Sequence, residues 1–198
     1  MKRSIWIVLS TLVLDQALKI WVKTHMYLGQ EYQVFDWFYI HFTENNGMAF
    51  GMEFGGNWGK LGLSLFRIVF VVFMASFLLK LIRKNADKVL IVSLSLVLAG
   101  AIGNIIDGTL YGILFSESYR QLATFLPEAG GYAPLFFGKV VDMFYFPIFK
   151  GYLPEWIPFC GGDYFVFFRP VFNIADSAIS IGVAIMVIFQ KKVMKELE

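Results

Sequence analysis

The chain contains few of the side chains that build metal sites and covalent active sites. Its 198 residues include one cysteine and two histidines. Because Cys160 is the single cysteine, an intramolecular disulfide and a thiolate metal cluster are both excluded. His25 and His41 lie far in sequence from any acidic cluster, so no zinc pattern is present. We therefore expect neither a metal nor a cofactor.

Charge is also scarce, since Asp, Glu, Lys and Arg make up 16% of the chain and hydrophobic residues 58%. Soluble domains carry roughly a quarter charged residues, so this composition excludes an ordinary soluble domain. A bilayer core of roughly 30 Å needs about 20 apolar residues in a helix. The sequence predicts four such transmembrane helices in a single domain, 1–198, with approximate ranges 4–23, 62–82, 88–107 and 170–190.

The first apolar run comes directly after the basic residues Lys2 and Arg3. The apolar core of a cleavable signal peptide also follows a basic segment. However, Asp15, Gln16 and Lys19 interrupt the run, and no small-x-small cleavage site follows it. We therefore interpret it as a transmembrane helix.

Lysine and arginine in the short connections set the orientation of a membrane protein, because these residues stay on the cytoplasmic side. In this chain one side collects Lys2, Arg3, Arg83, Lys84, Lys88, Lys191, Lys192 and Lys195. Both termini are therefore expected to be cytoplasmic, and the segments 24–61 and 108–169 are expected to face outward.

The outward segments are rich in aromatic residues. Residues 32–42 favour a β-strand, and Asn46-Gly47 is a strong hairpin-turn signal. We expect a small β-sheet against the outer membrane surface, in an otherwise all-α membrane protein. In the second segment, aromatic residues and Pro147, Pro154 and Pro158 favour aromatic loops, which either settle at the membrane interface or only pack against one another.

Ionisable side chains inside a membrane helix cost about 2.5–3.5 kcal/mol near the bilayer centre, so each needs an explanation. Asp15 and Lys19 are spaced i,i+4, the favourable order for an ion pair on one helix face. They either neutralise each other locally or support an active site from behind.

Two helices carry the same Asn-x-x-Asp spacing near their outer ends. Asn104 and Asp107 end the third helix, and Asn173 and Asp176 begin the fourth. With a helix starting at Pro170, Asp176 is expected about 9 Å below the outer end, which favours a functional site. Asp142, within an apolar stretch, is either an ordinary loop aspartate or part of that site.

The chemistry available to these residues is narrow. No serine or cysteine of the outer segments has a histidine or lysine beside it in the sequence, no glycine-rich phosphate loop is present, and Cys160 has no neighbouring base. Two carboxylates placed close together share a proton, so one can act as a base on water while the other polarises a peptide carbonyl. The same carboxylates could form an ion or proton relay, as in a small transporter or channel. A structural or partner-binding membrane protein is a third reading, which leaves a buried Asp176 unexplained.

Five motifs in order resemble the bacterial lipoprotein signal peptidase (signal peptidase II) family. They are Asp15-Gln16-x-x-Lys19, Asn46-Gly47-Met48-Ala49-Phe50-Gly51, Gly103-Asn104-x-x-Asp107, Val140-Val141-Asp142 and Phe172-Asn173-x-Ala175-Asp176. The resemblance implies an aspartic endopeptidase of the bacterial inner membrane that removes signal peptides from diacylglyceryl-modified prolipoproteins on the outer side. It also implies contact with membrane lipids and sensitivity to globomycin-type inhibitors. We expect a monomer and no nucleic acid partner.

By motif position the resemblance implies that Asp142 and Asp176 are the catalytic pair. It assigns site support to Asp15, Lys19, Asn46, Asn104, Asp107 and Asn173.

Two departures from the family pattern stand out. Gly108 follows Asp107 where the family usually has arginine, so Arg120, Lys139 or Arg169 would have to substitute. The connections on either side of Asp142 are longer than usual, which makes Asp163 the alternative second carboxylate.

Overall fold

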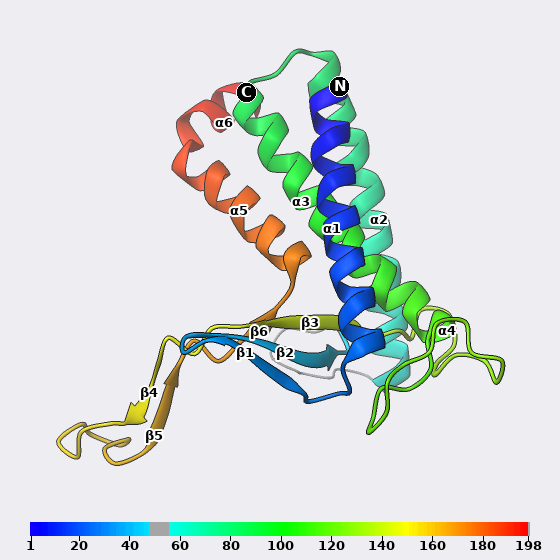
Figure 1. The fold of residues 1–198 in the computed structure, drawn as a ribbon. Helices are drawn as coiled ribbons and strands as arrows, with labels where there is room; N and C mark the ends of the chain where they lie inside the picture. The colour runs from blue at the N-terminus through cyan, green and yellow to red at the C-terminus, as the bar shows by residue number, and fades with distance from the viewer. Residues whose placement is uncertain (48–55, 198) are drawn as a thin grey trace.

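The computed structural model describes residues 1–47 and 56–197. It shows a bundle of long helices with a sheet across one end and both chain termini at the opposite end (Figure 1). The helices are α1 (Lys2–His25), α2 (Gly56–Arg83), α3 (Lys88–Ile106), the π-helical turn η2 (Asp107–Tyr111), α4 (Gly112–Leu114), α5 (Ile174–Ile188) and α6 (Gln190–Leu197). The strands are β1 (Glu31–Phe35), β2 (Phe38–Asn45), β3 (Val140–Tyr145), β4 (Phe149–Tyr152), β5 (Tyr164–Phe167) and β6 (Val171–Phe172).

Within the described part of the chain, three helices are long and apolar enough to cross a membrane. A fourth crossing is counted if α5 and α6, which meet at an angle of 86°, form one span. The first three predicted spans lie within α1, α2 and α3, and the third continues through η2 to Leu114.

The predicted fourth span, 170–190, is wrong at its outer end. Helix α5 begins at Ile174, because Val171 and Phe172 pair with β3 and Asn173 caps the helix. Asp176 therefore lies in the first turn of α5 rather than about 9 Å below the helix end. The 15 residues of α5 reach about 22 Å at 1.5 Å per residue, less than a bilayer core.

Helix α1 buries several charged side chains and exposes several large apolar ones. Asp15, Lys19 and Lys23 are buried, whereas Trp6 and Val13 are 70% and 65% exposed. This is the reverse of a helix on a soluble domain. It is the arrangement expected when lipid covers the apolar face and polar groups partner one another within the bundle.

Helix α3 is the centre of the bundle and contacts α1, α2 and α5. Small residues allow the close contact with α5: a Cβ at Gly100 would meet the backbone of Ala175, and one at Gly182 would meet Val97. Glycine at such positions lets two helix backbones approach closely. The tight α3–α5 contact brings Asn104 and Asp176 together.

The four-stranded sheet has the antiparallel order β1-β2-β3-β6. Its β1–β2 hairpin turns at Asp36-Trp37, so the predicted hairpin turn at Asn46-Gly47 is misplaced. There β2 ends, and Gly47 has a φ of +86°, which glycine adopts without strain. The rest of that motif, 48–51, lies outside the described residues.

The second outward segment contains strands that the sequence analysis did not predict. β3 pairs with β2 in the centre of the main sheet, and β4 and β5 form a separate hairpin that projects away from the bundle (Figure 1). Asp142 is consequently a strand residue, opposite Thr43 of β2, and not a loop aspartate. An apolar cluster that includes Val22, Phe42 and Met143 packs the sheet against α1.

Candidate functional site

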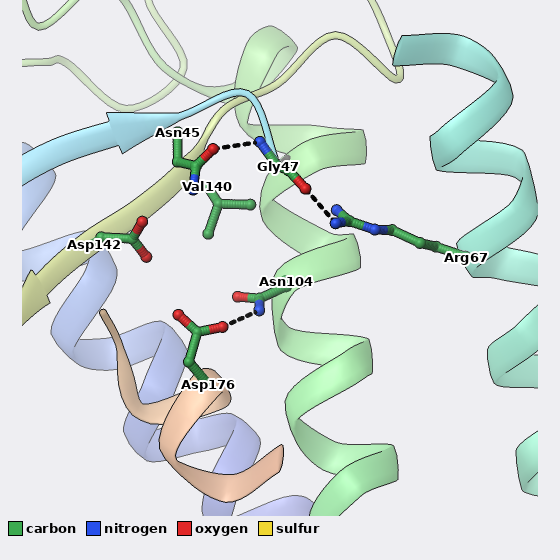
Figure 2. Close-up of a pocket in the computed structure, with 7 residues that line it drawn as sticks. All are labelled: Asn45, Gly47, Arg67, Asn104, Val140, Asp142 and Asp176. Atoms are coloured by element: carbon green, nitrogen blue, oxygen red, sulfur yellow. Dashed lines mark hydrogen bonds between the residues drawn. The ribbon is translucent and has the colours of Figure 1, made fainter. Parts of the chain in front are cut away.

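A cavity of about 280 Å³ lies where the sheet meets the helix ends. Among the described residues, its lining comes from β2, α2, α3, β3, α5 and the residue Gly47 that follows β2. These lining residues are Asn45, Gly47, Arg67, Asn104, Val140, Asp142 and Asp176. Figure 2 shows the carboxylates of Asp142 and Asp176 directed toward the same space, with Asn104 beside Asp176 and Arg67 entering from α2. Two carboxylates separated by 34 positions in the sequence thus share one cavity.

Asp142 is held almost fully out of water on the central strand β3, with 4% of the residue exposed. The side-chain amide of Asn173 donates a hydrogen bond of 2.7 Å to its Oδ1. Burial, followed by the negative charge of Asp176, raises the pKa of the Asp142 carboxyl to about 7. A carboxyl in this environment keeps its proton close to neutral pH.

Asp176 occupies the third position of α5 and completes a capping box. Its backbone N–H donates to Asn173 Oδ1 at 2.9 Å, and the backbone N–H of Asn173 donates to Asp176 Oδ2 at 3.4 Å. Asn104 donates to Asp176 Oδ1 at 2.7 Å. The Asp176 carboxylate thus accepts hydrogen bonds from its own helix cap and from α3.

Two asparagines connect the carboxylates. Besides its bond to Asp142, the Asn173 amide donates to Asn104 Oδ1 at 3.2 Å, and Asn104 donates in turn to Asp176. Asn173 is fully buried, so its orientation is fixed by these partners. The asparagines hold β3, α3 and α5 in one register around the cavity.

Lys19 lies behind the asparagines and joins α1 to α3. Its ammonium contacts Asp15 Oδ2 at 2.8 Å, Asp107 Oδ2 at 2.7 Å and Asn104 Oδ1 at 3.0 Å. All three charged side chains are 0–1% exposed. Lys19 thus neutralises two buried acids and also orients the amide that donates to Asp176.

Asp15 reaches α5 as well as Lys19. Its Oδ1 accepts the backbone N–H of Ala175 at 2.9 Å, one residue before Asp176. A Cβ at Gly103 would lie 2.7 Å from Asp15 Oδ2, so glycine makes room for this contact. The sequence left two interpretations of Asp15: a local ion pair, or a residue behind an active site. Asp15 makes a contact of each kind, an ion pair with Lys19 and a hydrogen bond to the residue before Asp176.

Gln16 was not named as a site residue from the sequence, although it stands in the first motif. Its amide donates to Asp107 Oδ1 at 2.9 Å and to Asp15 Oδ2 at 3.1 Å. Tyr111 donates to its carbonyl oxygen at 3.2 Å. Asp107 also accepts the backbone N–H of Val141 at 3.3 Å, and it begins the π-helical turn, a geometry frequent at functional sites.

The residues named from the sequence divide into two groups in the structure. Three line the cavity: Asn104, Asp142 and Asp176. Asp15, Lys19, Asp107 and Asn173 lie behind these residues and contact them or one another. Asn46 accepts a hydrogen bond from Lys60 at 3.0 Å, and its neighbours Asn45 and Gly47 line the cavity. Asp163 is exposed in the β4–β5 connection and does not line the cavity, whereas Asp142 does.

The cation that lines the cavity is Arg67 of α2, and none of the three proposed substitutes is among the lining residues. Lys139 pairs with Glu44 and Glu117, Arg120 lies over the ring of Tyr119, and Arg169 is exposed. The sequence analysis missed Arg67. The criterion that identified Asp15, a charged residue within an apolar run, applies equally to Arg67 in the run 62–82.

A second buried ionic cluster lies beside the site. Lys23 pairs with Glu44 and donates to Ser118 Oγ at 2.8 Å, and Lys139 pairs with Glu44 at 3.2 Å. Burial alone would raise the pKa of the Glu44 carboxyl, but Lys23 and then Lys139 hold it below its usual value. The fold thus places Ser118 beside Lys23, although the two residues are far apart in the sequence. Ser118 is fully buried and donates to Glu44, so this cluster ties the 115–139 connection to α1 and β2.

The arrangement of Asp142 and Asp176 is suited to acid–base chemistry on a group bound in the cavity. Within residues 1–47 and 56–197, no three His, Cys, Asp or Glu side chains converge as metal ligands would. The polar groups around the cavity are carboxylates, amides and one guanidinium, which can bind and polarise a peptide bond.

Comparison with known proteins gives a consistent result. Residues 7–191 match the family model described as signal peptidase (SPase) II. The chain is 56% identical over 178 residues to the lipoprotein signal peptidase of Porphyromonas gingivalis strain ATCC 33277, which covers 89% of this chain and 77% of that protein. It is 38% identical over 197 residues to the lipoprotein signal peptidase of Amoebophilus asiaticus, covering 95% of this chain and 79% of that protein. A bacterial membrane enzyme solved by the in meso method at 2.3 Å superposes with a TM-score of 0.64 and 26% identity, over 100% of this chain and 93% of that chain.

Proposed function

This chain belongs to the signal peptidase II family, and from that membership we propose that it is an aspartic endopeptidase that removes the signal peptide from diacylglyceryl-modified prolipoproteins. The family makes it a protease of lipoprotein processing, and its apolar helices make it a multi-pass membrane protein. The aspartic mechanism, the residues that carry it and the side of the membrane are the proposal.

The observation that carries the aspartic mechanism is the shared cavity of Asp142 and Asp176. The two carboxyls have different environments: Asp142 is buried and holds its proton to about pH 7, whereas Asp176 lies at a helix N-terminus and accepts from Asn104. When the environments of two titratable groups differ in this way, the roles of acid and base can be assigned.

Asp176 is the base and Asp142 the acid in the proposed reaction. Asp176 takes a proton from water, the water oxygen bonds to the scissile carbonyl carbon, and the protonated Asp142 donates a hydrogen bond to the carbonyl oxygen. The carbonyl electron pair returns as the C–N bond breaks, and the proton on Asp176 passes to the leaving amine. The products are a carboxylic acid on the signal peptide, which releases its proton to solvent, and a free amino group on the lipoprotein. No covalent enzyme intermediate forms.

We place this site at the outer face of the bacterial inner membrane, in a single domain with both termini cytoplasmic. The termini lie at one end of the bundle and the four-stranded sheet lies across the other (Figure 1). The cavity is lined by residues of that sheet and of the adjoining helix ends. The basic residues Lys2, Arg83 and Lys191 lie toward the terminus end, in agreement with the positive-inside rule. In this position a monomer would take its substrate from the lipid and would bind globomycin-type inhibitors.

The alternative of an ion or proton relay has less support. The buried ionic groups Asp15, Lys19 and Asp107 lie near the cavity, and toward the other end of α3 the buried polar residues Ser93 and Ser95 donate to carbonyls of their own helix. A relay across the membrane would need polar groups along the remaining length of the bundle.

Purified protein in lipid vesicles separates the two functions. The protease proposal predicts that a prolipoprotein carrying diacylglyceryl on its cysteine is cut before that cysteine, and that the unlipidated precursor is cut far more slowly. If vesicles containing the folded protein conduct ions or protons while the lipidated precursor stays intact, the relay is correct and the protease is not.

A further inference from the structure

Arg67 is a charged residue on a membrane helix that faces the cavity. It lies within α2 in the run Leu65-Phe66-Arg67-Ile68-Val69 and is partly buried. A cation in such a helix costs about 2.5–3.5 kcal/mol near the bilayer centre. A compensating interaction or a function is therefore needed to explain it.

Among the described residues, the hydrogen bonds of Arg67 leave some of its donors unused. Its Nη2 donates to the carbonyl oxygen of Gly47, whereas a guanidinium carries five N–H donors. Within the parts of the chain that the structure describes, no carboxylate lies within 4.0 Å of Arg67 in an ion pair. Since the side chain lines the cavity, the unused donors are available to a molecule bound there.

The end of β2 fixes the guanidinium at this position. A Cβ on Gly47 would lie 2.8 Å from Arg67 Nη1, and Gly47 has a φ of +86°. Asn45 accepts the backbone N–H of Gly47 at 2.9 Å (Figure 2). The absence of a side chain at Gly47 therefore leaves room for the guanidinium beside the end of β2, where it lines the cavity.

Arg67 also borders a second, mainly apolar cavity of about 130 Å³ between α2, α3 and α5. Its lining includes Phe70, Val71, Ala101, Ile105 and Ile179, and Arg67 and Asn104 belong to both cavities. A substrate with an apolar part in this second cavity would place its adjoining polar backbone at the guanidinium.

We propose that Arg67 is a catalytic residue that donates hydrogen bonds to the scissile carbonyl oxygen, together with Asp142. As water adds to the carbonyl carbon, the carbonyl electron pair moves onto this oxygen and the fixed positive charge stabilises the oxyanion. The pair returns when the C–N bond breaks, and Arg67 keeps its protons throughout. This inference rests on the proposed peptidase function and adds to it the electrostatic group that the two carboxylates cannot supply.

A purely structural role, in which Arg67 only fastens the end of β2 to α2, predicts different kinetics. Glutamine at this position keeps an amide donor for the Gly47 carbonyl but removes the charge, and lysine keeps the charge but loses the planar donor pair. Losing one oxyanion donor costs roughly 10²–10³-fold in kcat, whereas loss of a structural fastening lowers the melting temperature.

The test compares wild type, Arg67→Gln, Arg67→Lys and the matched control Arg83→Gln on cleavage of a diacylglyceryl prolipoprotein in detergent. Arg83 is an exposed cation at the far end of the same helix. We expect Arg67→Gln to lose about 10²–10³-fold in kcat with KM changed less than about threefold and the melting temperature unchanged. Arg67→Lys should recover at least about tenfold of the lost kcat, and Arg83→Gln should match wild type.

The proposal is overturned if Arg67→Gln cleaves within about threefold of wild type. It is also overturned if Arg67→Gln has a lower melting temperature and Arg67→Lys recovers none of the lost kcat. In both cases the wild type still cleaves and the peptidase function stands. If the wild type leaves the authentic substrate intact, the proposed function fails and the role of Arg67 fails with it.

Discussion

Replacing Asp142 by asparagine is expected to stabilise the protein above neutral pH while removing its activity. The pKa of this carboxyl rises from 3.8 to about 7 in the folded protein, through burial and then the charge of Asp176. The folded state therefore binds the Asp142 proton more tightly than the unfolded state does. Folding stability is lost as pH rises from about 4 to about 7, the interval between the two pKa values.

The magnitude follows from the shift of about 3 units. At 1.36 kcal/mol per unit, ionisation of Asp142 costs the folded protein on the order of 4 kcal/mol once the pH exceeds 7. Asparagine does not ionise, and its Oδ1 can still accept the hydrogen bond that Asn173 donates to Asp142. The variant should therefore gain stability relative to wild type as pH rises, with little gain at acid pH.

Thermal unfolding in detergent at about pH 5 and about pH 8 measures the difference in folding stability between the variant and wild type. The change in melting temperature scales with that stability difference. The matched control is Asp163→Asn, which makes the same substitution at an exposed carboxylate in the β4–β5 connection, outside the cavity. The reasoning is refuted if Asp142→Asn melts at or below the wild-type temperature at about pH 8, or if the difference stays constant with pH.

Three further predictions concern the surroundings of the site. Glu44→Gln leaves the buried Lys23 without its carboxylate and should destabilise the protein by about 3–5 kcal/mol, measured by denaturant or thermal unfolding; an unchanged midpoint contradicts the ionic cluster. Gly103→Ala should force its Cβ against Asp15 and cost about 1–3 kcal/mol, with cleavage reduced in the folded fraction; wild-type stability and rate would show that the contact is not needed. The cleavage rate should fall as pH rises through about 7, where Asp142 loses the proton with which it donates a hydrogen bond to the carbonyl oxygen. A rate that stays flat to about pH 9 argues against the acid role of Asp142.

The sequence predicts the helices well because one physical requirement dominates them. A membrane helix must present about 20 apolar residues, and α1, α2 and α3 contain the predicted spans. The start of α5 was misplaced because hydropathy does not detect pairing of Val171 and Phe172 with β3 or the capping box of Asn173. Those interactions depend on a strand far away in the sequence.

Part of the candidate site was predictable because a charged side chain in a membrane helix costs free energy and therefore indicates a function. Asp15, Lys19 and Asp107 stand out because charges in apolar helices need partners, and the structure shows those partners. By the same criterion Arg67 should have been named. Asp142 could not be assigned from local sequence, because its burial arises from the pairing of β3 between β2 and β6. The contact of Ser118 with Lys23 is likewise created only by the fold.

The central claim is that Asp142 and Asp176 together hydrolyse the peptide bond, and single-turnover cleavage tests it most directly. Wild type, Asp142→Asn and Asp176→Asn are mixed in excess with a diacylglyceryl prolipoprotein, after melting curves have established that each variant is folded. The account predicts that either substitution slows cleavage by at least about 10³-fold, because acid and base act in the same step. Cleavage within about tenfold of wild type by either folded variant would contradict the assignment.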